Sequence, residues 1–297
     1  MNQGLLARRD FLRTLTLAGG ACVASPLFGA EPGGQGLKEP VFRVAKAENP
    51  GAAGAAGHPL DPALAMAQEY LVRIQSDIAD YTATIIKRER IKGVLGEYEY
   101  MNAKIRNRKV ENGKVVVPLS AYLKFLKPKH VEGREVVWVE GANNGKLRAH
   151  EGGLKGRFLP SVWLDPLGSL AMQGQLHPIT DIGVENLVMK LIEKGQNDRK
   201  HGDCDVKFIP GAKLNGNPCT VLQVWHPVQK PHFEFHLAEI LIDDVLKIPV
   251  RYAAHHWPTD PKDLKGPVLE EYTYIDVKLN QNLTDADFDS ENPAYNF

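Results

Sequence analysis

The chain has 297 residues, which is enough for one large domain or two small ones. Its 36 basic and 36 acidic residues cancel, and this balance argues against a nucleic-acid-binding protein, which usually carries a basic excess. After residues 1–30, no apolar run approaches the roughly 20 residues that a membrane-spanning helix needs.

Residues 1–30 have the composition of a removable export signal. The motif R-R-D-F-L at positions 8–12 resembles a twin-arginine signal, and an apolar run at 15–24 follows it. An ordinary secretory signal and a buried helix are the alternatives. Ala30 is a suitable last residue of the removed piece. Gly19 stands where a lipoprotein box has Leu, Val or Ile, which disfavours lipidation of Cys22. We therefore expect an exported protein of the periplasm or cell envelope.

The segment 31–58 is rich in Gly, Ala and Pro, which predicts a flexible tether. A single folded domain is then expected over 59–297. It begins with an amphipathic helix, because Asp61 is a suitable N-cap and Pro62 suits the first turn. The apolar residues of this helix recur at helical spacing: Leu64, Ala67, Leu71, Ile74 and Ile78.

From residue 81 onward the apolar period changes to two, which predicts strands. Asn143-Asn144-Gly145 and Asn215-Gly216 are hairpin-turn signals. No regular alternation of strands and helices occurs, and this disfavours a parallel doubly wound sheet. About ten strands are expected, mostly in sequential hairpins, over 81–93, 96–109, 119–128, 134–141, 145–152, 204–211, 219–227, 232–244, 248–258 and 268–280.

One helical island at 178–195 interrupts the strands. Thr180 or Asp181 is the expected N-cap, an apolar stripe runs from Val184 to Ile192, and Gly195 is the expected stop. These elements predict an α+β, mainly β fold. It consists of one large, curved antiparallel sheet with two amphipathic helices covering its concave face.

Two cysteines, Cys204 and Cys219, follow the export signal. An oxidising compartment permits a disulfide between them. A tight turn at Asn215-Gly216 would, however, place Cys219 opposite Ala212, so the bridge needs a wider or bulged loop. The pair is a disulfide candidate on these terms.

Several segments resemble a known family. "ILIDDVLKIPVRYAAHHW" at 240–257 resembles the I-D-x-x-x-x-x-P-x-R segment of Lol-type periplasmic lipoprotein carriers, and "EEYTYIDVKLNQNLTDADFD" at 270–289 resembles their terminal strand. With 80–93 and 123–141, the chain from Leu60 to Phe297 resembles an exported bacterial family, domain of unknown function 1571, which looks like a member of the Lol carrier superfamily. The resemblance implies an open half-barrel with helices over its mouth that binds acyl chains non-covalently.

A half-barrel that keeps a cavity can bury acyl chains at ~0.8 kcal/mol per methylene. The alternative is an interior filled by its own side chains, as in most small barrels. The candidate ligand-binding residues are large apolar side chains on the predicted strands: Leu123, Phe125, Trp138, Trp225, Phe235 and Tyr252.

Histidines gather in the C-terminal half. His232 and His236 share strand parity with Glu234, and His256 follows on the next strand, so zinc ligation is a weak alternative. No H-E-x-x-H motif occurs, and exposed sheet histidines are the simpler interpretation. We expect no metal and no cofactor.

Basic residues alternate at Lys104, Arg106 and Arg108, so they project from one face. They could meet an anionic head group, a glycan or an acidic partner. Alternatively they pair across strands with nearby acids: Glu89, Glu97 and Glu99.

The sequence contains no G-x-S-x-G motif, and we assign no catalytic residue. The predicted function is non-enzymatic binding of a hydrophobic or lipid-bearing ligand, with a lipid or lipoprotein as partner. The helices around Leu71 and Leu187 would act as a movable cover. One alternative is an envelope sensor or protein-interaction module with a filled barrel and a protein partner. Another is a zinc-dependent hydrolase.

Overall fold

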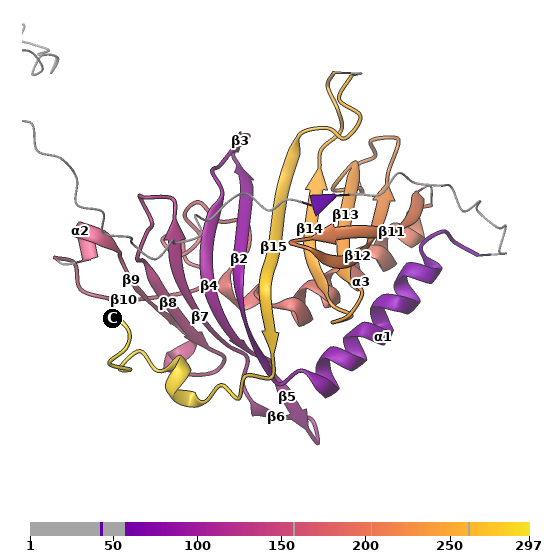
Figure 1. Cartoon of the computed structure of the whole chain (residues 1–297). Coiled ribbons are helices and arrows are strands. Elements are labelled where there is room, and N and C mark those ends of the chain that lie inside the picture. The colour runs from indigo at the N-terminus through magenta and orange to yellow at the C-terminus, as the bar shows by residue number, and fades with distance from the viewer. Residues whose placement is uncertain (1–41, 44–56, 157, 203, 261) are drawn as a thin grey trace, which may run out of the picture. The chain divides into compact units, whose positions relative to one another are not determined.

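The computed structural model describes residues 42–43, 57–156, 158–202, 204–260 and 262–297 (Figure 1). The expected signal peptide, with Cys22 and Ala30, and most of the expected tether lie outside the described residues. Phe42–Arg43 is the exception, because it forms a two-residue strand, β1, beside Leu214 and Lys213. The tether itself stays a prediction.

The main sheet is antiparallel throughout, and its last strand, β15, pairs with the early strand β2. Within the described residues, β1 and β10 are its two ends and do not pair with each other. The spatial order is β1, β11 (Asp205–Leu214), β12 (Asn217–Trp225), β13 (Leu237–Asp243), β14 (Pro249–His255), β15 (Val268–Leu279), β2 (Asp80–Ile91), β4 (Glu99–Arg106), β7 (Ser120–Lys127), β8 (Glu135–Val139), β9 (Leu147–His150) and β10 (Val162–Leu164).

The sheet curves strongly in Figure 1, so the predicted fold class is confirmed: mainly β, with one large open antiparallel sheet. All ten predicted strand segments contain a strand. The short strand β3 (Val94–Leu95) on β2 and the separate hairpin of β5 (Lys109–Glu111) and β6 (Lys114–Val117) were not predicted. They are too short to show a clear period of two.

One predicted strand begins too early. The pattern placed a strand from His232, but β13 begins at Leu237. Pro231 lies in a turn that is closed by a hydrogen bond of 3.0 Å from Phe233 N to the Lys230 carbonyl, so the chain passes His232 in a turn and not in a strand. Glu234, His232 and His236 therefore do not share the face of one strand.

Two long helices lie against the sheet: α1 (Asp61–Asp77) and α3 (Val184–His201). A short helix, α2 (Gly153–Gly156), and three 3-10 turns, η1 (Asn143–Gly145), η2 (Ile179–Asp181) and η3 (Asp285–Phe288), complete the structure. No helix among the described residues is both long enough and apolar enough to cross a membrane.

The predicted limits of α3 are wrong at both ends. Thr180 and Asp181 lie in η2, and Gly183, with a φ of 104°, is the N-cap. The helix passes through Gly195 without stopping. A Cβ at Gly195 would lie 2.9 Å from Leu64 Cδ2, so this glycine allows α1 and α3 to approach closely.

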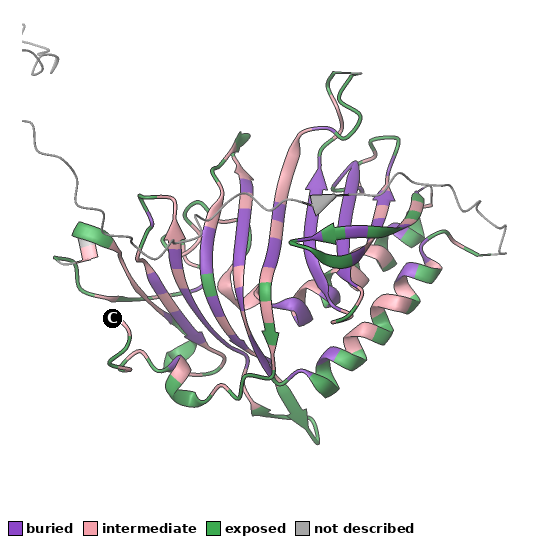
Figure 2. Cartoon of the chain, viewed as in Figure 1, coloured by how far each residue is buried: buried purple, intermediate pink, exposed green. Residues whose placement is uncertain are grey.

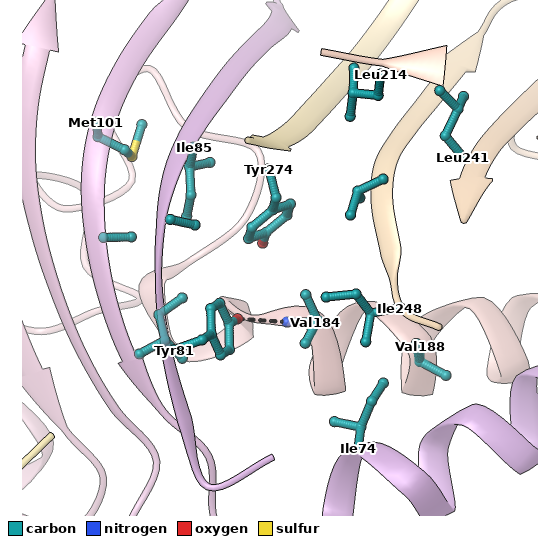
Figure 3. Close-up of a cluster of buried hydrophobic side chains, with 14 of the residues drawn as sticks. Ile74, Tyr81, Ile85, Met101, Val184, Val188, Leu214, Leu241, Ile248 and Tyr274 are labelled. Atoms are coloured by element: carbon teal, nitrogen blue, oxygen red, sulfur yellow. Dashed lines mark hydrogen bonds between the residues drawn. The ribbon is translucent and has the colours of Figure 1, made fainter. Parts of the chain in front are cut away.

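Both helices cover the concave face of the sheet, as predicted. Ala63 of α1 and its N-cap Leu60 pack against a buried cluster from β12, β13 and β14, together with Leu187 and Leu191 of α3. In Figure 2 the strands are mostly buried, whereas the outer surface of α1 is exposed. At its N-terminus α3 is anchored by a hydrogen bond from Val184 N to Tyr81 Oη of 2.9 Å, drawn in Figure 3.

The cysteines do not form the candidate disulfide. The structure holds both as buried thiols, Cys219 in one core cluster and Cys204 in another. Asn215 and Gly216 have positive φ values of 52° and 91°, and the tight turn that they make pairs Cys219 with Ala212. The register expected from the turn is confirmed, and it is the physical reason that the bridge is absent.

Candidate ligand-binding cavity

A cavity of about 600 Å³ lies between the concave face of the sheet and residues 164–183, which we term the cover segment. Its volume falls within the range of small-molecule pockets, roughly 300–1,000 Å³. β2, β4, β7, β8 and β9 form one wall, and β14 and β15 extend it. The helix α3 contributes Leu187, Lys190, Leu191 and Lys194.

One part of the cavity wall is apolar. Leu123 and Phe125 alternate along β7, so both point to the concave face, and Leu123 lies opposite Val136 on β8. Met101 on β4 is the register partner of Phe125 and also lines the cavity. The cover segment adds further apolar residues: Leu164, Leu170, Ala171, Ile179 and Ile182.

The other part of the wall carries buried charge. The Lys87 ammonium lies 3.4 Å from Glu89 Oε2 and 3.2 Å from Glu99 Oε2, and it donates a hydrogen bond to Gln175. Lys87 and Glu89 are both less than 10% exposed. A buried charge is tolerated when it is paired, and this cluster meets that condition.

A tyrosine and a third carboxylate extend this polar cluster. Tyr272 Oη donates to Glu89 Oε1 at 2.5 Å and lies 3.2 Å from Glu270 Oε2, which also accepts a hydrogen bond of 2.7 Å from His177. Burial, with the nearby charges of Glu270 and Glu89, raises the pKa of Tyr272 far above its ordinary value. Burial alone would raise the pKa of Glu270, but the contact with His177 brings that pKa below its ordinary value.

The polar cluster attaches the cover segment to the sheet. Gln175 meets Lys87, the Leu176 N–H donates to Glu89 Oε2 at 3.2 Å, and His177 meets Glu270. Three successive residues of the cover segment thus contact two strands, β2 and β15. The sequence analysis missed this cluster. The alternation of Lys87 and Glu89 on a strand was the available signal, because both had to point to one face.

A second, much smaller cavity of about 70 Å³ lies beneath the two helices. α1 contributes Leu64 and Ala67, α3 contributes Leu191 and Asp198, and the sheet supplies the floor. Tyr252 lines this cavity as well as the large one.

The structure divides the six candidate ligand-binding residues. Leu123, Phe125 and Tyr252 line the large cavity, and Phe235 lines the small one. Trp138 and Trp225 line neither. Trp138 is buried in the core, where its Nε1 donates to the Gly145 carbonyl at 3.3 Å, and Trp225 packs edge-on against His236.

The candidate metal ligands do not converge. His232 stacks on His201 with ring centroids 4.2 Å apart, and His236 Nδ1 lies 3.0 Å from the His226 carbonyl. His256 is exposed beside Trp257. Across the described ranges, no three His, Cys, Asp or Glu side chains come close enough to hold a metal ion.

The alternating basic residues have acidic partners, though not the expected ones. Lys104 pairs with Asp287 at 2.7 Å, Arg106 with Asp285 at 2.7 Å, and Arg108 with Glu140 at 2.6 Å. The C-terminal segment around η3 supplies two of these carboxylates. The expected acids Glu89 and Glu99 instead surround Lys87 inside the cavity.

Asp198 should make stability depend on pH. Burial raises the pKa of this carboxyl to about 6 from 3.8, so its contribution is complete below pH 3.8 and is lost as pH rises through about 6. We expect Asp198→Asn to be more stable than the wild type by about 1–2 kcal/mol at pH 7.5, and by only about a third of that amount at pH 4.5, where the buried carboxyl is still protonated in the folded protein. Urea unfolding at both pH values measures this difference.

The neighbouring His226, 3.5 Å from Asp198, has a pKa lowered chiefly by burial and therefore favours the fold above pH 6.5. Its pH dependence has the opposite sign, and because His226 is neutral at pH 7.5 in the folded protein, it does not alter the difference expected there. Asp77→Asn, at an exposed aspartate of α1, is the control and should be neutral at both pH values. Equal destabilisation of Asp198→Asn at both pH values would contradict the charge-burial account.

The fold and the cavity define a class of protein: an open antiparallel half-barrel with two long helices and an internal cavity whose wall is partly apolar and partly polar. The chain belongs to the family described as "Protein of unknown function (DUF1571)", whose model matches residues 78–297. This match confirms the family expected from the sequence. No curated protein matches the chain.

Solved structures show a loose likeness. A DUF1329 family protein from Desulfovibrio piger has 10% identity and a TM-score of 0.35 over 78% of this chain and 98% of its own. A LolA superfamily protein from Nitrosomonas europaea has 11% identity and a TM-score of 0.32 over 75% and 97%. The MucA/MucB complex of Pseudomonas aeruginosa gives 15% identity and a TM-score of 0.40 over 77% of this chain and 61% of that chain.

Proposed function

We propose that this protein binds a hydrophobic or lipid-bearing ligand in the cell envelope, without catalysis, and that acyl chains lie in the large cavity. The observation that carries the proposal is the cavity of about 600 Å³, whose apolar wall includes Met101, Leu123 and Phe125. Desolvation of an acyl chain there supplies the driving force, at ~0.8 kcal/mol per methylene.

The polar end of the same cavity suits the head group of a ligand that carries an acyl chain. Small-molecule sites combine a mostly apolar lining with a few placed polar groups that orient the ligand. Lys87, Tyr272 and Glu270 are such groups here, and His177 lies beside them on the cover segment. A ligand with an apolar chain and a hydrogen-bonding head group fits this division. The proposed location in the envelope rests on the export signal expected at residues 1–30.

Filling the cavity should weaken binding. Ala149 on β9 lines the large cavity, so Ala149→Phe places a ring where the acyl chain would lie. We expect the affinity for a fluorescent fatty-acid analogue to fall at least about tenfold. Because the ring enters existing space, the free energy of unfolding should change by less than about 1.5 kcal/mol. Fluorescence titration and urea unfolding measure the two quantities.

The control is Ala65→Phe, which adds the same ring at an exposed position of α1 and should bind like the wild type. Undiminished binding by Ala149→Phe would refute the cavity as the site. Native mass spectrometry of the protein from a host with the twin-arginine pathway provides the second test. An adduct of lipid mass supports the proposal, whereas a bare chain favours the envelope protein-interaction module.

A further inference from the structure

Nearly half of the exposed large apolar side chains among the described residues lie between Leu154 and Leu176, a stretch that overlaps the cover segment. Single exposed apolar residues are ordinary, but a concentration of this kind marks an interaction site. We term six of them the apolar edge: Leu154, Phe158, Val162, Trp163, Leu167 and Leu170. Phe158 is 84% exposed and Leu154 is 75% exposed.

The apolar edge lies at an end of the sheet. β10, which holds Val162 and Trp163, is the last strand in the sheet order and pairs with β9. α2 and the region of β10 lie together at one extremity of the sheet in Figure 1, and Figure 2 shows α2 as largely exposed.

The apolar edge is continuous with the cavity. Leu170 is 70% exposed and also lines the cavity, and Leu164 and Pro166 line it from the same segment. Leu170 therefore belongs both to the apolar edge and to the cavity wall, so the two surfaces meet at this residue.

The chemistry of the segment favours a lipid surface over a protein. Its exposed residues include a tryptophan and a phenylalanine among leucines, which is the composition of interfacial membrane contacts. The sequence from 153 to 176 has one acidic residue, Asp165, and two basic ones, Lys155 and Arg157, so its net charge suits anionic lipid. At three residues, β10 is too short to recruit another chain firmly by strand pairing.

We propose that the apolar edge docks on a bilayer surface that contains anionic lipid, and that ligand chains pass between this surface and the cavity. The second half of this proposal rests on the proposed function, and the docking itself does not. The surface lies in the plane of the lipid interface and does not span it, because its residues come from a turn of helix, a three-residue strand and loops.

Co-sedimentation with vesicles of phosphatidylcholine and phosphatidylglycerol tests the docking. The test variant combines Leu154→Glu, Phe158→Glu and Leu167→Glu, three exposed residues that do not line the cavity. We expect its vesicle affinity to fall at least about tenfold. The matched control places the same three charges at exposed valines elsewhere: Val72→Glu, Val228→Glu and Val245→Glu. Because the control carries the same added charge as the test variant, it measures the cost of that charge, and it should lose less than about half of its vesicle binding.

A second measurement does not depend on the triple variant. Lipids brominated in the acyl region should quench Trp163, so wild-type fluorescence should fall on vesicle binding, and Trp163→Phe should remove most of that quenching. Equal binding by wild type and test variant, or equal losses in test and control variants, would overturn the docking. So would a wild-type dimer that the test variant converts to monomer, because the apolar edge would then meet a second copy.

The fatty-acid analogue separates the two proposals. If the test variant binds the analogue in solution like the wild type but not vesicles, both proposals stand. If the wild type binds vesicles through the apolar edge but does not bind the analogue, the cavity function fails and the docking remains.

Discussion

Tyr81→Ala is expected to lower the free energy of unfolding by about 3–5 kcal/mol, the range for loss of a fully buried aromatic ring. Tyr81 is 0% exposed and lies in the cluster of Figure 3, between β2 and the start of α3. Its hydroxyl accepts the hydrogen bond from the Val184 N–H, and burial raises its pKa well above the ordinary value. Denaturant unfolding measures the loss.

Tyr81→Phe measures the contribution of the hydrogen bond to stability separately from that of the ring. It keeps the packing but leaves the buried Val184 N–H without its acceptor, which should cost about 1–3 kcal/mol. Tyr70→Phe, at a half-buried tyrosine of α1, is the control and should cost less than about 0.5 kcal/mol. If Tyr81→Phe were as stable as the wild type, the anchoring of α3 by this hydroxyl would be contradicted. Because α3 forms part of the cavity wall, the same variants should also weaken ligand binding.

Glu271→Ala is expected to destabilise the protein by about 3–5 kcal/mol, because it removes the carboxylate from a buried ion pair. Glu271 and Arg251 are each 5% exposed, and Arg251 Nη2 donates to Glu271 Oε2 at 2.7 Å. Arg88 Nε lies 2.9 Å from the other carboxylate oxygen. These residues lie on β14, β15 and β2, and a sequence neighbour of each one lines the cavity: Tyr252, Tyr272 and Lys87. Urea unfolding measures the effect.

Two further variants test whether the loss comes from an unpaired buried charge. Arg251→Met combined with Glu271→Leu removes the two most buried charges and leaves Arg88, whose side chain is 24% exposed, to be solvated by water. The double variant should therefore recover most of the stability that Glu271→Ala loses. Glu132→Ala removes the acid of the exposed Lys129–Glu132 pair and should cost less than about 1 kcal/mol. A loss for Glu271→Ala no larger than that for Glu132→Ala would show that the buried pair contributes little.

The strands and helices could be predicted because their signals are local. Residues 80–91 and 268–279 alternate in polarity, and α1 repeats at helical spacing, so each burial pattern follows from neighbours in sequence. The turn at Asn215-Gly216 likewise determined the register of β11 and β12, and with it the separation of Cys219 from Cys204. Family membership was also evident from local motifs.

The start of β13 and the limits of α3 were not predictable from the same signals. A glycine such as Gly195 often ends a helix, but here it lies within α3 and makes room for Leu64, which is far away in sequence. Likewise, nothing near His232 in the sequence indicates that its ring stacks on His201 of α3. Such outcomes depend on which element packs against the residue.

The sequence by itself determined the mainly β, antiparallel architecture, two covering helices and several apolar residues that face the interior, Leu123 and Phe125 among them. Only the tertiary structure decided that the interior holds a cavity, that Trp138 and Trp225 lie outside it, and that Lys87 joins Glu89 and Glu99 at its polar end. The reason is physical. Periodicity states which face a side chain occupies, whereas a cavity depends on how side chains from distant strands and the cover segment share the same space.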